Sequence, residues 1–461
     1  MPSVTLVCPR EVRTSEEGSM ARETALTRWP KIVQSMMGDT EKTLRLELQS
    51  ELADERGRIQ NALRSLKEDI LRDRPLRQLS FLFSLMPLQS DGRPDIDNFN
   101  TKLASFGRSI TWHKCPWLFA ECHPYRSALT QISRRSMFLV WQTHDIFARQ
   151  KLNALVASHA AVEELYERYL SLANSGAFAT TTTTTTTTTT EAKQHLFFEM
   201  TEVALWSNAT DLSLPGSTKL DQISALQGTK AIQAGQARII SNDMAAAWGH
   251  LQSSPSKGRP DIVLDNAGFE LFTDLVYTLY LLGAGFASTI KLHVKSIPWF
   301  VSNVMPHDMD VLLSTLADAA VFPGASARAV AALLRRAYQD GRLTVEEHPF
   351  WTTGSDFQEM PISAPDLLES LRASTLVVFK GDLNYRKLVR DSKWPHTTSF
   401  KQAIKVLGRT GIKILALRTK KADLCVGLDE QTLGRVEREA PKKAWVRSGK
   451  YAVASFSNGL P

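Results

Sequence analysis

The stretch IVLDNAGFELFTDL, from Ile262 to Leu275, joins a short apolar run to an amphipathic segment through two polar residues. The run ends at Asp265 and Asn266. Gly268 then allows the chain to turn, and the residues after it show a pattern typical of a helix. A buried strand that ends in a carboxylate and an amide indicates a ligand site at its carboxyl end. Either residue alone could simply cap the helix, because Asp and Asn are both favoured at N-caps. The neighbouring strands decide between these interpretations.

The run at residues 261–266 is one of four β-rich segments, and helical patterns lie between them. The other three segments cover residues 288–296, 374–381 and 412–418. Strands that alternate with helices predict βαβ units and a mainly parallel sheet, so the fold class is α/β. Ligands of such sheets bind beyond the carboxyl ends of the strands.

The first third of the chain shows helical patterns instead of β-rich runs. The charge-rich segment from Thr40 to Leu79 and the block at residues 127–173 carry apolar residues at three- and four-residue steps, which predicts helices. The uninterrupted threonine tract has no apolar face and predicts a loop or linker. The expected division is a disordered N-terminus at 1–20, an all-helical domain at 21–179, the tract Thr180–Thr190, and an α/β domain at 191–461.

Composition narrows the class of protein. The chain has 461 residues, 43% hydrophobic and 22% charged, which is ordinary for a globular protein of two domains. Its four cysteines lack the spacing of a zinc site and indicate free thiols in a reducing compartment. We find no apolar stretch long enough to span a bilayer and no secretory signal at the start, so we expect a cytoplasmic protein that does not enter membranes, with the nucleus as the alternative compartment.

The net charge of +7 raises the question of a nucleic-acid partner. The 55 basic residues are scattered among 48 acidic ones and form no long block, so nucleic acid is not the expected partner. A local basic pocket for a small anion is compatible with the same charge balance.

Polar side chains follow each of the other β-rich segments as well. Lys295 and Asn303 follow the second, the run KGDLNYRK at 380–387 follows the third, and Arg418 to Lys421, RTKK, ends the fourth. One such cluster alone is ordinarily a solvated loop, but four at one sheet edge favour a site. Carboxylate and amide oxygens suit Mg²⁺ or Mn²⁺, and lysine and arginine bind phosphate through charge-assisted hydrogen bonds.

These segments, taken together, resemble a known family. DNAGFELFTDL, KSIPWFVS, FKGDLNYRKL with DSKWP, and RTKK resemble the damage-control phosphatases, specifically the subfamily marked by an RTxK motif. WHKCPWLFAECHPYR, LWSNATDLSL and, more weakly, TRWPKIV extend the resemblance over most of the chain. The human member of that subfamily was also described as an acidic-residue protein methyltransferase.

The resemblance implies a metal-dependent phosphatase of small phosphorylated metabolites, such as fructose 1-phosphate or fructose 6-phosphate. It implies a three-layer α/β/α sandwich with a helical N-terminal domain, and activity supported by Mn²⁺, Ni²⁺ or Co²⁺, with Mg²⁺ as a further candidate. By motif position, Asp265 and Asn266 are expected to bind metal and Lys421 to bind phosphate, and these are the expected catalytic residues. The expected substrate-binding residues are Asp382, Leu383, Asn384, Tyr385 and Arg386, and the expected cleft residues are Glu121, Asn208, Asp211, Lys295 and Arg418.

One position departs from the family pattern. Where the family has WFVSD, this chain has WFVSN, so the third expected metal ligand is Asn303. An amide oxygen can coordinate a cation but brings no negative charge, and hard divalent cations depend on ligand charge. We therefore expect weaker metal binding, a shifted metal preference or slower turnover.

The expected reaction is in-line attack of metal-activated water on the phosphoryl group, with Lys421 and Arg386 stabilising its charge and Asp382 and Asn384 holding sugar hydroxyls. A carboxylate nucleophile is the other route that the sequence leaves open. Three alternative functions also stay open: a sugar-phosphate binder or scaffold without catalysis, motivated by Asn303; a protein carboxyl methyltransferase, which lacks a glycine-rich cofactor turn here; and, least supported, a nucleic-acid binder.

Overall fold

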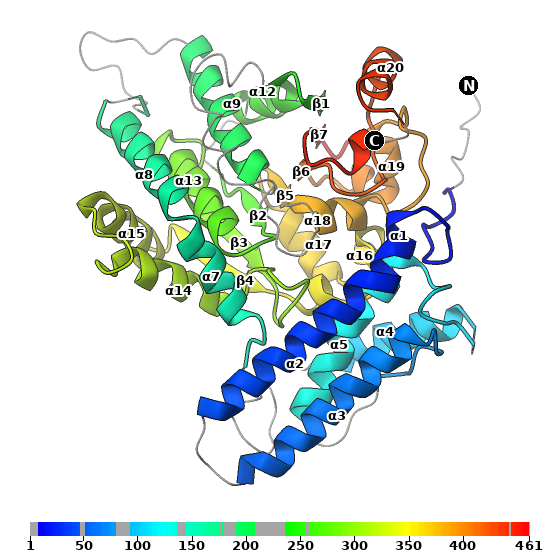
Figure 1. Cartoon of the computed structure of the whole chain (residues 1–461). Helices are drawn as coiled ribbons and strands as arrows, with labels where there is room; N and C mark the ends of the chain where they lie inside the picture. The colour runs from blue at the N-terminus through cyan, green and yellow to red at the C-terminus, as the bar shows by residue number, and fades with distance from the viewer. Residues whose placement is uncertain are drawn as a thin grey trace.

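The structure is a computed structural model, and it describes residues 8–46, 51–79, 93–107, 109–135, 144–175, 177–178, 190–207, 236–253, 258–441 and 444–460. Its centre is a seven-stranded sheet in the order β1-β7-β6-β5-β2-β3-β4 (Figure 1). Among the strand pairs of the described residues, only β6–β7 is antiparallel, which confirms the mainly parallel sheet. The strands are β1 (Ile239–Asn242), β2 (Asp261–Val263), β3 (Ile290–Val294), β4 (Leu343–Glu347), β5 (Val377–Lys380), β6 (Ile414–Thr419) and β7 (Ala452–Ser457).

Both faces of the sheet are buried, which makes the three-layer sandwich. Along β5, Val378 belongs to one apolar cluster, whereas Val377 and Phe379 belong to the cluster on the opposite face. This alternation is the two-residue period of a strand. The first face is covered by α7 (Ala148–Ala157), α8 (His159–Asn174), α9 (Thr190–Ser207), α12 (Met244–Ser253), α13 (Phe269–Gly283), α14 (Pro306–Ala317) and α15 (Ala325–Gln339). The second is covered by α16 (Met360–Ser363), α17 (Pro365–Arg372), α18 (Gly381–Leu388), α19 (Phe400–Ala403) and α20 (Glu430–Glu439).

The N-terminal helices form a separate core that covers the carboxyl edge of the sheet. These helices are α1 (Met20–Glu23), α2 (Trp29–Leu46), α3 (Glu51–Leu71), α4 (Arg93–Ser105) and α5 (Trp117–Arg135), and the long pair α2 and α3 is drawn in blue in Figure 1. Their core includes Trp299 to Val301, Leu383 and Ala422, which follow β3, β5 and β6. The helical part therefore packs on the loops that carry the predicted site. Among the described helices, none combines the length and apolar character needed to cross a membrane.

The structure differs from the expected division in two places. Residues 8–20, expected to be disordered, bond to distant loops, as in Val12 N to Asp391 O (3.0 Å) and Thr14 N to Cys115 O (3.1 Å). Helix α8 packs with α13 and α15 in the sandwich layer, and Leu155 of α7 belongs to the same sheet-side cluster. The threonine tract lies outside the described residues except for Thr190, which begins α9.

Candidate metal and phosphate site

The carboxyl ends of β2 and β3 bring together the three expected metal ligands. Asn303 Nδ2 lies 3.0 Å from Asp265 Oδ1 and 3.5 Å from Asn266 Oδ1, and Asn266 Nδ2 lies 3.2 Å from Asp265 Oδ2. The three residues are at most 3% exposed. Helix α13 begins after Gly268 without a capping side chain, so neither Asp265 nor Asn266 serves as its N-cap.

The loop that carries Asn303 after β3 has a strained backbone two and three residues before it. Phe300 and Val301 have φ of 44° and 67°, and Val301 is β-branched, which makes this conformation a true outlier. The ring of Tyr125, from α5, stacks on Phe300 at 5.0 Å between centroids. A short backbone bridge between Asn266 and Asn303 completes the arrangement. Strain of this kind persists only where surrounding packing enforces it, and it is concentrated at functional sites.

Sequence reasoning missed Glu270, one helical turn after Asn266. Asn266 Nδ2 donates to Glu270 Oε2 at 2.7 Å, and Ser302 Oγ donates to Asn266 Oδ1 at 2.7 Å. The amide of Asn266 is therefore oriented with its oxygen toward Asn303. The available signal was an acidic residue in the first turn of an otherwise apolar helix.

Lys380 forms a buried ion-pair network behind this group. Its Nζ lies 2.7 Å from Asp274 Oδ1 and 3.5 Å from Glu270 Oε1, and these residues are at most 1% exposed. Burial raises the pKa of Asp274 to about 7, with the Glu270 charge adding to the effect and Lys380 opposing it. Burial alone would lower the pKa of Lys380, but the two carboxylates raise it above its ordinary value. The ammonium therefore stays charged beside Glu270.

Gly381 lets the turn after β5 approach the carboxylate of Asp265. It has φ of 85°, and a Cβ placed there would lie 1.8 Å from Asp265 Oδ2. This position needs glycine both for its backbone conformation and for its space.

Gly381→Ala is expected to lower the free energy of unfolding by about 2 kcal/mol or more, because it combines a left-handed backbone with a collision against a buried side chain. Urea unfolding measures the loss. Gly249→Ala is the matched control, since a Cβ there meets nothing within 4 Å. Equal stability of the two variants would contradict the close approach at Gly381.

Lys295 supplies a second buried cation at this edge. Its Nζ donates to Leu264 O at 3.1 Å, and the residue is 1% exposed. Burial lowers the pKa of Lys295 to about 8, an effect that the Asp265 charge opposes and the Lys387 charge increases.

In the segment Asp382–Arg386, Asn384 is bound through its side-chain nitrogen, and its side-chain oxygen is left without a donor among the described residues. Asn384 Nδ2 donates to Lys380 O at 2.7 Å and to Val263 O at 3.2 Å, which joins α18 to the end of β2. Its Oδ1 is buried without a partner among the described residues. By contrast, Leu383 lies in the helical core and Tyr385 in the sandwich core, where its hydroxyl accepts from Val426 N at 3.3 Å.

The two charged residues of this segment are held in buried ion pairs. Arg418 Nη2 lies 2.7 Å from Asp382 Oδ1. Burial would raise the pKa of Asp382, but the charges of Arg418, Arg386 and Lys421 hold it below the ordinary value. Arg386 bonds Glu121 Oε2 at 2.6 Å and Asp391 Oδ2 at 2.8 Å. The predicted phosphate ligand Arg386 is thus already bound to two carboxylates, one of them the predicted cleft residue Glu121.

The RTKK segment ends β6 at the same edge. Lys421 is 6% exposed, and its charge is among those that act on Asp382. Lys420 points into the loop that follows, where its Nζ donates to Ala422 O at 3.2 Å. The predicted cleft residues Asn208 and Asp211 lie outside the described residues.

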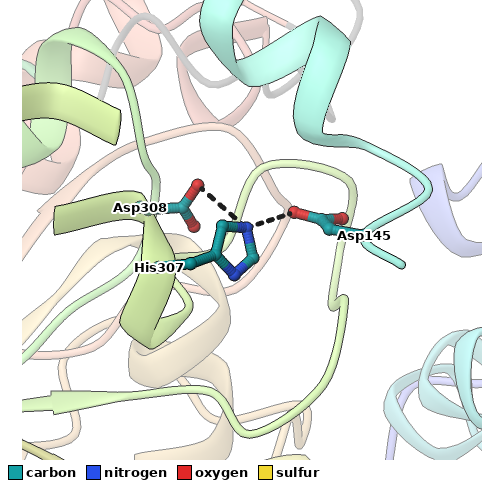
Figure 2. Close-up of side chains that lie close together, drawn as sticks. All are labelled: Asp145, His307 and Asp308. Atoms are coloured by element: carbon teal, nitrogen blue, oxygen red, sulfur yellow. Dashed lines mark ion pairs between the residues drawn. The ribbon is translucent and has the colours of Figure 1, made fainter. Parts of the chain in front are cut away.

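A second group of possible metal ligands lies at the start of α14. Figure 2 shows Asp145, His307 and Asp308, whose ligand atoms lie within 4.8 Å of one another. Lys151 Nζ lies 2.8 Å from both Asp145 Oδ2 and Asp308 Oδ2. Because this ammonium already bridges the two carboxylates, we assign the group to an ionic contact between α7 and α14.

The stability that this contact provides is expected to depend on pH through His307. Its bond to Asp145 raises its pKa above 6.5, against the effect of burial. A raised pKa stabilises the fold below the unfolded value near 6.5, and the contribution is lost as pH rises through the folded value. His307→Gln should therefore cost at most about 1 kcal/mol below pH 6 and nothing near pH 9, because the half-exposed imidazole is screened by water.

Urea unfolding across this pH range measures the effect, with His195→Gln on the exposed face of α9 as the control. A His307→Gln loss that is constant with pH would show that the imidazole acts only through packing.

The primary group fits a divalent cation by its chemistry. Asp265 and Asn266 offer oxygen ligands, and Asn303 Oδ1 is buried without a partner among the described residues. A buried carbonyl oxygen without a donor is costly, and a cation would satisfy it once the Asn303 amide turned that oxygen toward Asp265 and Asn266. The fit is chemically sound although the set carries a single ligand carboxylate.

Comparison with known proteins identifies the relatives of this chain. The model of the damage-control phosphatase ARMT1-like domain matches residues 24–436. The chain is 30% identical to damage-control phosphatase ARMT1 of Danio rerio over 99% of both chains, and 34% identical to that of Mus musculus over 76% of both. A solved structure of a DUF89 family protein from Pyrococcus horikoshii is similar at 12% identity and a TM-score of 0.39, covering 79% of this chain and 89% of that one. The chain belongs to the ARMT1-like damage-control phosphatase family.

Proposed function

We propose that this chain hydrolyses sugar phosphates, such as fructose 1-phosphate or fructose 6-phosphate, with the help of a divalent cation. Membership of a damage-control phosphatase family supports a metabolite phosphatase. The observation that carries the finer proposal is the convergence of Asp265, Asn266 and Asn303 at the buried carboxyl edge of the sheet.

The cation would be held by Asp265, by the amide oxygen of Asn266 and by Asn303 Oδ1. When bound, it supplies positive charge for phosphoryl oxygens and lowers the pKa of a water molecule. Mn²⁺, Ni²⁺ and Co²⁺ are the proposed ions, with Mg²⁺ as the fourth to test. Glu270 would hold the Asn266 amide in its productive orientation through the 2.7 Å hydrogen bond.

The chain's own cations would bind the phosphate. Lys421 follows β6 and Lys295 follows β3, so both ammonium groups belong to the sheet edge that carries Asp265. Ammonium groups stabilise the charge of a transferring phosphoryl group, and their effect is larger where water is excluded. Arg386 would act less directly, since its two carboxylate partners fix α18.

Asn384 is the proposed ligand of a sugar hydroxyl. Its amide nitrogen is used by the backbone of β2 and β5, whereas its oxygen has no partner among the described residues. A hydroxyl donor would satisfy that oxygen. This supports a polyol phosphate over an apolar phosphate ester.

A second candidate function is a sugar-phosphate binder without turnover. It is favoured by Asn303, which bonds directly to Asp265 and contributes no ligand charge. Binding of fructose 6-phosphate with no release of phosphate would distinguish it from the phosphatase.

Phosphate release from fructose 1-phosphate, fructose 6-phosphate and glucose 6-phosphate tests the proposal, with Mn²⁺, Ni²⁺, Co²⁺, Mg²⁺ or a chelator. We expect release with at least one sugar phosphate and its loss in chelator. Methyl transfer from S-adenosylmethionine to protein carboxylates, measured in parallel without phosphate release, would support the methyltransferase alternative instead.

A further inference from the structure

The amide of Asn303 faces the metal ligands with its nitrogen. Nδ2 lies 3.0 Å from Asp265 Oδ1 and 3.5 Å from Asn266 Oδ1, while Oδ1 is buried without a partner among the described residues. A cation needs the opposite arrangement, with oxygens directed at it. Asn303 therefore directs its N–H donors, and not its oxygen, toward the place where a cation shared with Asp265 and Asn266 would bind.

A carboxylate at position 303 would behave differently. Two carboxylates about 3 Å apart in a buried site repel each other, and one must bind a proton unless a cation lies between them. An amide avoids the repulsion, because its N–H groups donate to the carboxylate. The nearby ammonium of Lys295 already gives Asp265 a countercharge. The cation-free arrangement is thus internally satisfied around Asp265.

We infer that Asn303 is an internal competitor for the cation: its Nδ2 bonds Asp265 in the cation-free protein, and a half-turn of the amide presents Oδ1 when a cation binds. The half-turn exchanges the two ends of a planar group of nearly equal shape. It places the three oxygens of Asp265, Asn266 and Asn303 together and moves Nδ2 to the position where Oδ1 now lacks a donor. Glu270 keeps Asn266 from turning with it, because it accepts from the Asn266 amide.

This inference rests on the proposed binding of a cation at this site. It assigns to Asn303 the role of stabilising the protein when no cation is bound. The hydrogen bond to Asp265 must break before the cation binds, so the free energy of that hydrogen bond lowers the affinity for the cation. An Asn303→Asp variant should show the reverse behaviour, with a destabilised cation-free state and a stronger response to metal.

Thermal unfolding in chelator and in millimolar Mn²⁺ tests the inference without measuring turnover. We expect Asn303→Asp to melt about 5 °C or more below the native protein in chelator, and to gain more from Mn²⁺ than the native protein gains. Asn61→Asp is the matched control, because Asn61 is exposed on α3. Equal melting of Asn303→Asp and native protein in chelator, or equal gains in Mn²⁺, would overturn the inference.

Asn303→Ala provides a test that does not depend on the folding of the Asp variant. It removes the donor to Asp265 and adds no charge, so we expect melting in chelator to fall by about 2–4 °C. Melting at the native temperature would overturn the inference, since the bond to Asp265 would then contribute nothing. Because neither melting experiment requires phosphate release, failure of the inference and failure of the phosphatase proposal give different results.

Discussion

Asp265→Ala is expected to lower kcat/KM for phosphate release by about 100-fold to 1000-fold, the range seen when one preorganised electrostatic group is removed from an active site. Asp265 is the only carboxylate of the three expected metal ligands, and it is the acceptor to which both neighbouring amides direct hydrogen bonds. Its loss removes the ligand charge and the group that orders the other two. Initial rates with a saturating metal ion measure the effect.

The matched control for this substitution is Asp310→Ala, which removes an exposed acidic residue from α14. It should leave the rate within twofold of the native value, as expected for a surface change remote from the chemistry. Asp265→Asn keeps the side-chain shape and separates lost charge from a cavity. Native rates in Asp265→Ala, with native folding, would place the chemistry elsewhere in the molecule.

Asn303→Asp is expected to increase cation affinity and phosphate release, each by about tenfold, because the added carboxylate restores ligand charge at a buried oxygen site. The position has the required geometry, since its side chain lies 3.0 Å from Asp265 Oδ1. Calorimetric titration with Mn²⁺ and initial rates at subsaturating Mn²⁺ measure the two gains.

Asn61→Asp serves as the control, because it adds the same charge on the exposed surface of α3. A gain in both variants would indicate a general effect of net charge. A loss of activity in Asn303→Asp alone would contradict the predicted gain and would show that the native phosphatase site is adapted to the amide.

Four strands could be predicted from sequence because each lies in a short run rich in apolar and β-branched residues. The predicted runs at 261–266, 288–296, 374–381 and 412–418 contain β2, β3, β5 and β6. The three missed strands have weaker local signals: β1 is only four residues long and reads IISN, β4 reads LTVEE at the sheet edge and carries exposed residues, and β7 reads AVASFS, with small side chains. The antiparallel placement of β7 beside β6 depends on chain topology, which no local pattern reveals.

The segment expected to be a single helical run from Thr40 to Leu79 is divided between α2 and α3. Helix α2 begins earlier, at Trp29, which is buried in the helical core. A three- or four-residue period indicates a helix but does not show where two antiparallel helices separate, since both share the same period.

Part of the candidate site could be predicted because parallel strands place their ends together. Asp265, Asn266 and Asn303 were predicted from their positions after two strands, and the structure brings them within hydrogen-bond distance. The environment of Arg386 could not be predicted, because its partner Glu121 lies 265 positions away in the chain. From sequence alone, a cationic side chain near a site cannot be distinguished from one that is already bound by a distant carboxylate.

The decisive test of the proposed phosphatase is phosphate release from fructose 1-phosphate and fructose 6-phosphate in Mn²⁺, measured for native protein, Asp265→Ala and Asn303→Asp. We expect release by the native protein, a loss of about 100-fold or more in Asp265→Ala and a gain in Asn303→Asp. Silence of both the native protein and Asn303→Asp on these and other sugar phosphates, with every metal, would contradict it.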